Sequence, residues 1–250
     1  MTRNQEIWNA VTMLPTPLFG LYFIFSGSWI TEENLVKANE ILLGNKPDFL
    51  VGVEDKCISS AFFPNLHALP PWTTMSVVIG YLLHSPCSIY FHLLCAFKLH
   101  TWQERLNHWS RRLDQAMIHI MGVFIVFGMS GNIRLGVIHL LFSIDSSYRL
   151  FQPGFRPRSN QIRIFISIIL TTLPAIMYHH DEDFIKLTVI NLISSWIFSA
   201  YPFGGYSHGI FHLIIALTNP IQLKLSTKVL SCQNAIHIGA TCANLLSKAN

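Results

Sequence analysis

The chain has 250 residues, of which 51% are hydrophobic and only 12% are charged, and its mean hydropathy is +0.40. Soluble domains carry roughly 25% charged residues, so this composition argues against a soluble globular domain. The net charge of +4 is modest, and the chain lacks the basic face with interleaved aromatic residues that nucleic-acid binding requires. We therefore expect an integral membrane protein whose partner is the lipid bilayer, with no nucleic-acid partner.

A membrane-spanning helix needs about 20 mostly apolar residues, with about 17 as the lower limit. Backbone groups in lipid must be satisfied within the segment itself, so apolar stretches of this length are expected to be helices. We expect an all-α membrane protein, in which residues 1–250 form a single domain built as a bundle of seven transmembrane helices. The expected spans are residues 10–30, 73–97, 114–131, 132–148, 162–178, 184–203 and 206–223.

The connections between these spans differ greatly in length. Only Ser130-Gly131-Asn132 joins the third and fourth spans, which predicts a tight helical hairpin. A polar, acidic loop over residues 31–70 follows the first span, and the tail beyond Leu225 is mildly amphipathic without forming an eighth span. A disulfide between Cys57 of this loop and a tail cysteine (Cys232 or Cys242) is an open alternative, whereas Cys87 and Cys95 are expected to be small apolar residues within a span.

The basic residues of the short loops predict the orientation in the membrane. When the 31–70 loop and the tail are excluded, nine Lys and Arg residues lie on one side and two, Arg134 and Lys186, on the other. Short loops rich in Lys and Arg remain in the cytoplasm. The N-terminus is therefore expected in the cytoplasm and the C-terminus outside or in a lumen.

Three histidines within the apolar spans form a candidate metal site. His208 and His212 are four residues apart, which places both imidazoles on one face of a helix. His92 comes late in the second span, Asp114 opens the third, and the His208/His212 pair opens the seventh, so all should lie at one depth near the cytoplasmic side. Histidine, serine and aspartate side chains inside a bilayer are costly and indicate function.

Three histidines with an open fourth position are a typical ligand set for catalytic zinc. Zinc lowers the pKa of a bound water to near 7 and so supplies hydroxide at neutral pH. Asp114 is the candidate for holding that water and passing its proton to a leaving amine. Ser88, one helical turn before His92, could orient the water or stabilise a developing oxyanion.

Each of these residues also has an ordinary structural interpretation. Paired histidines at this spacing are a weak motif by themselves. Asp114 could pair with Arg111 or Arg112 at the membrane surface, and Ser88 could be a packing hydroxyl between helices. Two further histidines inside the spans, His119 and His139, are expected to be hydrogen-bonded packing residues. The remaining histidines are expected near span ends or in loops, with interfacial or solvated roles: His67, His84, His100, His108, His179, His180 and His237.

The order of these motifs resembles the seven-span family of progestin and adipoQ receptors and hemolysin III proteins, whose residue set alkaline ceramidases share. Arg112-Leu113-Asp114 with Ile118 is similar to a Leu-Asp-x-x-x-Ile pattern of that family, and residues 207–212 look like its last motif. Glu6-Ile7-Trp8-Asn9 resembles its ExxNxxxH motif, but Met13 replaces the final histidine.

The resemblance implies that His92, His208 and His212 hold Zn²⁺, with Asp114 and Ser88 beside the water. It also implies either hydrolysis of the amide bond of a ceramide-like membrane lipid or lipid-linked receptor signalling. Three functions follow as hypotheses: a zinc-dependent lipid amide hydrolase, a signalling receptor with a structural zinc, and a hemolysin III-like pore or transport protein. Convergence of the polar residues at one depth favours the first two over a permeation path.

Overall fold

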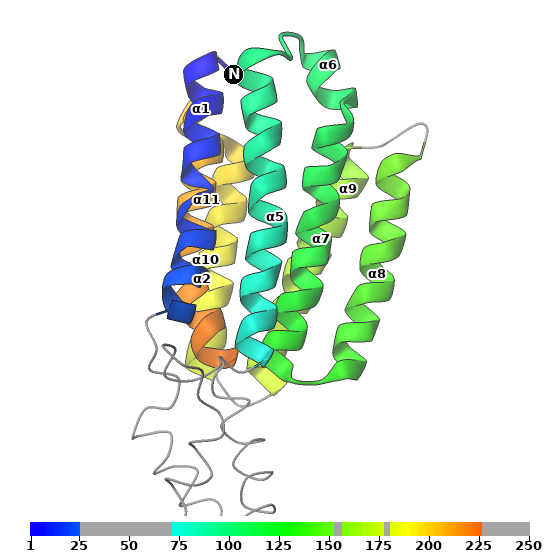
Figure 1. The fold of residues 1–250 in the computed structure, drawn as a ribbon, viewed down its shortest axis with the longest axis vertical. Helices are drawn as coiled ribbons and strands as arrows, with labels where there is room; N and C mark the ends of the chain where they lie inside the picture. The colour runs from blue at the N-terminus through cyan, green and yellow to red at the C-terminus, as the bar shows by residue number, and fades with distance from the viewer. Residues whose placement is uncertain (26–71, 153–156, 178–180, 227–250) are drawn as a thin grey trace, which may run out of the picture.

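The computed structural model describes residues 1–25, 72–152, 157–177 and 181–226. Within these ranges the chain forms a bundle of helices that run along one common long axis (Figure 1). The expected 31–70 loop, the tail after residue 226 and the disulfide considered for Cys57 lie outside the described residues.

The described elements are all helical. They are α1 (Arg3–Thr12), α2 (Pro15–Phe25), α5 (Trp72–Phe97), α6 (Trp102–Asn107), α7 (Trp109–Ser130), α8 (Ile133–Phe151), α9 (Pro157–Met177), α10 (Asp181–Ala200), the 3₁₀ turn η3 (Gly204–Tyr206) and α11 (Ser207–Ala216). The chain is helical again over residues 218–226. The all-α expectation is confirmed for the described part of the chain.

Contacts between neighbouring helices close the bundle into a ring. The consecutive pair α1 and α2 packs against α5, and α5 packs against α7. Helix α7 contacts both α8 and α9, α9 contacts α10, and α10 contacts α11. Helix α11 then returns to α1, so these two helices lie side by side.

Five segments of the described chain are long and apolar enough to cross a membrane: Arg3–Phe25, Thr73–Phe97, Trp109–Ser130, Arg158–Ile176 and Glu182–Ala200. They correspond to the first, second, third, fifth and sixth expected spans. Helix α8, the expected fourth span, has sufficient length but carries Arg134, Asp145 and Arg149. Helix α11, the expected seventh, has only 10 residues before Leu217 interrupts it.

The first of these segments begins earlier than the sequence predicted, at Arg3 instead of residue 10. A capping box starts α1, because the Thr2 hydroxyl accepts from the Gln5 N–H while the Gln5 side chain accepts from the Thr2 N–H. The helix is interrupted after Thr12, and Pro15 starts α2, a position where its missing N–H costs nothing. The capping box therefore adds a polar helical turn at the N-terminal end of the apolar stretch.

The outer surface of the bundle is apolar and much of its interior is polar. On α8, Ile133, Ile138 and Leu141 are 68%, 58% and 62% exposed, whereas His139 and Ser143 on the same helix are buried. A soluble protein in water would bury the first group and expose the second. Together with the five apolar segments, this arrangement identifies an integral, multi-pass helical membrane protein.

The hairpin between α7 and α8 is as tight as predicted. Gly131 ends α7 in the left-handed conformation, with φ of 60°, and its N–H donates to the Phe127 carbonyl. Asn132 then caps α8, because its side-chain oxygen accepts from the Arg134 N–H at 2.9 Å.

Glycines allow α5 and α7 to approach each other closely. A Cβ added at Gly128 would lie 2.6 Å from the Thr73 carbonyl oxygen and would clash with the Val77 side chain. A Cβ added at Gly80 would lie 3.1 Å from Phe124 Cβ. Small residues at helix crossings are a main source of packing energy in membranes, so this contact fixes the position of α5 against α7.

We expect Gly128→Ala to destabilise the protein by about 1–3 kcal/mol, because the new methyl group overpacks the α5–α7 contact. Gly136→Ala is the matched control, because its added Cβ would be in ordinary contact, 3.4 Å from Phe127. Alanine has the higher helix propensity, so the control should be neutral or stabilising by up to about 1 kcal/mol. Thermal unfolding in detergent tests this, and equal melting temperatures for the two variants would contradict it.

Candidate metal centre

A sharp reversal of the chain after α10 positions the pair His208 and His212. After α10, Tyr201 and Gly204 both adopt positive φ values, of 50° and 59°, and η3 leads directly into α11. The Ser207 hydroxyl accepts from the Phe203 N–H at 2.9 Å, which anchors the start of α11. His208 and His212 therefore lie in the first two turns of α11, next to the end of α10.

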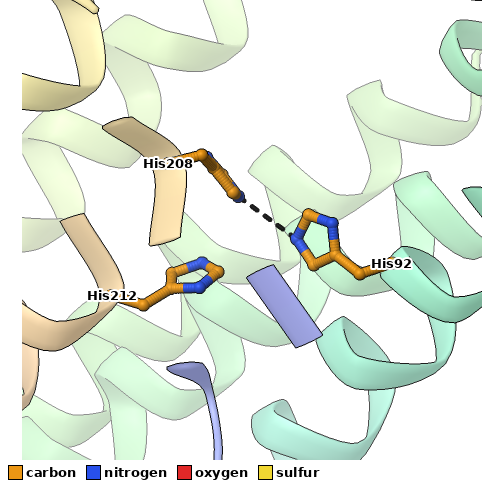
Figure 2. Close-up of side chains that lie close together, drawn as sticks. All are labelled: His92, His208 and His212. Atoms are coloured by element: carbon orange, nitrogen blue, oxygen red, sulfur yellow. Dashed lines mark hydrogen bonds between the residues drawn. The ribbon is translucent and has the colours of Figure 1, made fainter. Parts of the chain in front are cut away.

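His92, from the last part of α5, completes a buried group of three imidazoles (Figure 2). One ligand atom from each ring lies within 4.8 Å of the others. The Nε2 atoms of His92 and His208 are 3.2 Å apart, and the centroids of the His208 and His212 rings are 4.5 Å apart. The structure thus brings His92 together with the distant His208/His212 pair, as predicted.

Helix α1 contacts the far side of two of these rings. The Nδ1 atom of His92 lies 2.8 Å from Glu6 Oε2, and Nδ1 of His212 lies 3.2 Å from the Asn9 carbonyl oxygen. Both partners are acceptors only, so each Nδ1 carries the proton and donates it. The Nε2 atom of each ring is then unprotonated and available as a ligand.

The third ring, His208, is positioned by packing. Its ring lies against Phe198 and Phe211, with centroid distances of 5.4 and 5.9 Å. Its Nδ1 is buried and has no hydrogen-bond partner among the described residues. Its Nε2 faces His92, as Figure 2 shows.

This geometry fits a metal ion. Two ligands of a tetrahedral zinc with Zn–N bonds of about 2.0–2.1 Å are roughly 3.3 Å apart, close to the 3.2 Å between the His92 and His208 nitrogens. Without a metal, the same distance allows a hydrogen bond in which Nε2 of His208 donates to Nε2 of His92. The group of His92, His208 and His212 could therefore hold a metal ion through three neutral imidazoles.

Asp114 lies in the second turn of α7, facing α5. Its Oδ1 is 3.3 Å from Nε2 of His84, and the Ser88 hydroxyl also interacts with its carboxylate. The carboxylate has electrostatic interactions with His92 and His208 as well. The two predicted catalytic residues therefore lie together, beside the histidine group.

His84 was assigned wrongly from the sequence. We expected it near a span end with an interfacial role, but it lies within α5, is 9% exposed and contacts Asp114. The sequence did contain a signal, because His84, Ser88 and His92 follow each other at intervals of four residues and therefore share one face of a helix. Glu6 belonged to a recognised motif, yet nothing in its sequence context indicated contact with His92.

The expectation for His139 agrees with the structure. Its Nδ1 lies 3.2 Å from the Ser143 hydroxyl and its Nε2 lies 3.3 Å from the Ser167 hydroxyl, between α8 and α9. His119 is fully buried on α7 and interacts with Asn160 of α9, but neither of its ring nitrogens has a hydrogen bond of normal length among the described residues, so the expectation of a hydrogen-bonded histidine is not met there. Both lie apart from the three-histidine group.

No family model, curated protein or solved structure matches this chain. The fold and the site therefore define the class by themselves. The protein is a multi-span helical membrane protein with a buried group of three histidines that could hold a metal ion.

We expect detergent-purified protein to contain about one metal ion per chain, and we expect His92→Ala, His208→Ala and His212→Ala each to lose it, because two imidazoles rarely retain zinc. His139→Ala is the control, since it removes an equally buried imidazole outside the group. Metal content is measured by inductively coupled plasma mass spectrometry. A well-folded wild type without metal would contradict the metal site.

Proposed function

We propose that this protein is a zinc-dependent intramembrane hydrolase that cleaves the amide bond of a ceramide-like lipid. The observation that supports it is the placement of Asp114 and Ser88 beside three converging imidazoles in the bundle. A metal site with a purely structural role would not need the buried carboxylate of Asp114 next to it. A carboxylate inside a bilayer is expensive and is retained where chemistry requires it.

The donor set favours zinc as the ion. Neutral imidazoles suit zinc, and three of them leave one position open. When bound, zinc supplies a Lewis acid and lowers the pKa of water at that position to about 7. His92, His208 and His212 are the residues that would hold it.

Hydrolysis adds one water across the C–N bond of the amide. The water oxygen bonds to the carbonyl carbon, the C–N bond breaks, and the amine leaves with a proton that came from the water. In this proposal Asp114, which interacts with His92 and Ser88, accepts this proton on a carboxylate oxygen and passes it to the amine nitrogen. His84 fixes the carboxylate through the 3.3 Å contact, and the Ser88 hydroxyl is the candidate donor to the developing oxyanion.

A membrane lipid is the substrate class that fits this location. The outer surface of the bundle is apolar, so a lipid can reach the helices by diffusion within the bilayer. The resemblance to the receptor, hemolysin III and ceramidase group points to the amide of a ceramide-like lipid.

We further propose that α8 and α11 also cross the membrane, giving seven spans. The outward face of α8 is apolar, and α11 continues after Leu217 into the helical residues 218–226. The contacts of α8 with α7 and α9, and of α11 with α10 and α1, support this arrangement. The loop charges favour a cytoplasmic N-terminus and an outer or lumenal C-terminus.

We expect Asp114→Asn to reduce hydrolysis of a ceramide panel by about 10²- to 10⁴-fold, the usual contribution of a general base. Its metal content should remain that of the wild type, because Asp114 does not hold the ion. Asp145→Asn is the control, since Asp145 is half-exposed and ion-paired with Arg149 and Arg163 on the other side of the bundle. Release of free fatty acid from reconstituted vesicles provides the measurement.

If the wild-type protein holds zinc and hydrolyses none of the ceramides faster than Asp114→Asn, the hydrolase proposal is wrong. A receptor with a structural zinc then becomes the leading account. That account predicts ligand-dependent signalling that is lost with the metal and unaffected by Asp114→Asn.

The topology proposal predicts that the two chain ends lie on opposite sides of the membrane. A short protease-cleavable tag at the N-terminus should be protected in sealed, right-side-out vesicles, and the same tag at the C-terminus should be cleaved. Detergent-permeabilised vesicles are the control, in which both tags are cleaved. Cleavage or protection of both tags in sealed vesicles would exclude an odd number of spans.

A further inference from the structure

We infer that α1 forms the outer shell of the metal centre, and that Glu6, held by Arg105, is the positioning residue for His92. The inference rests on the proposed function only in requiring a metal at the three histidines. It concerns a carboxylate that takes no part in the proposed hydrolysis.

Glu6 is deeply buried and both of its oxygens are used. Its side chain is 4% exposed; Oε2 contacts Nδ1 of His92 at 2.8 Å, and Oε1 contacts Nη1 of Arg105 at 2.9 Å. Burying a carboxylate is costly unless it is paired and hydrogen-bonded. The two partners, from α5 and α6, satisfy this requirement where the three helices meet.

The consequence for His92 is a fixed tautomer and a fixed ring orientation. A carboxylate accepts hydrogen bonds and donates none, so Nδ1 of His92 must carry the proton. The lone pair of Nε2 then points toward His208, whose Nε2 is 3.2 Å away. A carboxylate behind a metal-binding histidine also raises the basicity of the ring and strengthens it as a ligand.

Arg105 is itself held rigidly. Its Nε donates to the Leu99 carbonyl at 2.9 Å and its Nη2 donates to the Cys95 carbonyl at 3.1 Å, both near the C-terminal end of α5. Such carbonyls lack partners within their own helix and attract cationic side chains. Arg105 therefore connects the end of α5 to Glu6 and keeps the carboxylate beside His92.

The short helix α6 sets the position of Arg105. A capping box starts it, in which the Thr101 hydroxyl and the Glu104 side chain each accept from the backbone N–H of the other residue. The backbone N–H groups of Thr101 and His100 lower the pKa of the Glu104 carboxyl, which keeps it ionised as an acceptor. Arg105 follows directly and faces the bundle.

Helix α1 also positions the ring of His212. Its Asn9 carbonyl accepts from Nδ1 of His212, and the Thr12 hydroxyl lies 3.2 Å from the same nitrogen. Glycines of the facing segment let α1 approach, because a Cβ at Gly209 would clash with Trp8. One helix thus determines the tautomers of two of the three candidate ligands.

A purely structural role for Glu6 is the alternative, in which it only joins α1 to α5. The two roles differ in what Glu6→Gln would change. The amide of glutamine offers one acceptor and one donor, so it cannot satisfy the His92 and Arg105 donors together. If α1 is the outer shell, metal affinity falls; if Glu6 only joins helices, thermal stability falls while the affinity of the folded protein is unchanged.

The test uses full-length protein in detergent, stripped of metal and titrated with Zn²⁺ and Co²⁺ against a competing chelator. We expect Glu6→Gln to weaken Zn²⁺ binding by about 10- to 100-fold, the usual effect of an outer-shell substitution, and to change the visible absorption of the Co²⁺ form. Asp183→Asn is the matched control, because Asp183 is also buried and paired with a cation, Lys224, but lies on α10. Its metal affinity should equal that of the wild type.

Arg105→Gln is the second variant, in case Glu6→Gln does not fold. It leaves the Glu6–His92 contact in place but removes the guanidinium that holds Glu6. We expect the affinity for Zn²⁺ to fall roughly tenfold. Unchanged Zn²⁺ affinity and an unchanged Co²⁺ spectrum in the folded variants would overturn the inference while leaving the metal centre and the hydrolase proposal intact.

Other outcomes separate the two proposals. Weakened metal binding in Glu6→Gln, in a protein that hydrolyses no ceramide, would support the outer shell and refute the hydrolase. A folded wild type that binds neither Zn²⁺ nor Co²⁺ would overturn both.

Discussion

Polar groups enclosed within an apolar helix bundle cannot exchange hydrogen bonds with water, so burying them is costly unless a partner within the protein satisfies them. In this protein the buried carboxylate of Glu6 is satisfied by side chains of two other helices. One of its oxygens contacts His92 of α5, and the other contacts Arg105 of α6. The placement of α1 beside α5 and α11 therefore decides which nitrogen of the His92 and His212 rings faces the centre of the site.

The same constraint explains why the site lies where the helix ends meet. Helix α1 lies between α5 and α11 in the ring of contacts and bridges them. Its carboxylate serves α5, and its backbone carbonyl at Asn9 serves His212 of α11. The close approach of α5 to α7 at Gly128 and Gly80 places Asp114 against the face of α5 that carries His84, Ser88 and His92.

Two kinds of buried polar cluster are therefore present in this bundle, and they differ chemically. Between α8 and α9, His139 uses both ring nitrogens on the hydroxyls of Ser143 and Ser167, so it needs no further ligand. In the three-histidine group, the Nε2 atoms of His92 and His208 face each other at 3.2 Å, and the ring of His212 lies beside both. Only the second arrangement brings three imidazole ligand atoms within 4.8 Å of one another, which is the physical reason for assigning the metal there.

The sequence by itself determined the all-α membrane class, five of the spans, the α7–α8 hairpin and the three histidines. These depend on local properties: apolar length, the glycine after Ser130, and the four-residue spacing that puts two side chains on one helix face. Only the tertiary structure decided that Glu6 contacts His92, 86 positions away, and that His84 contacts Asp114. Partners on different helices depend on how the helices pack, and hydropathy and spacing along one chain carry no record of that packing.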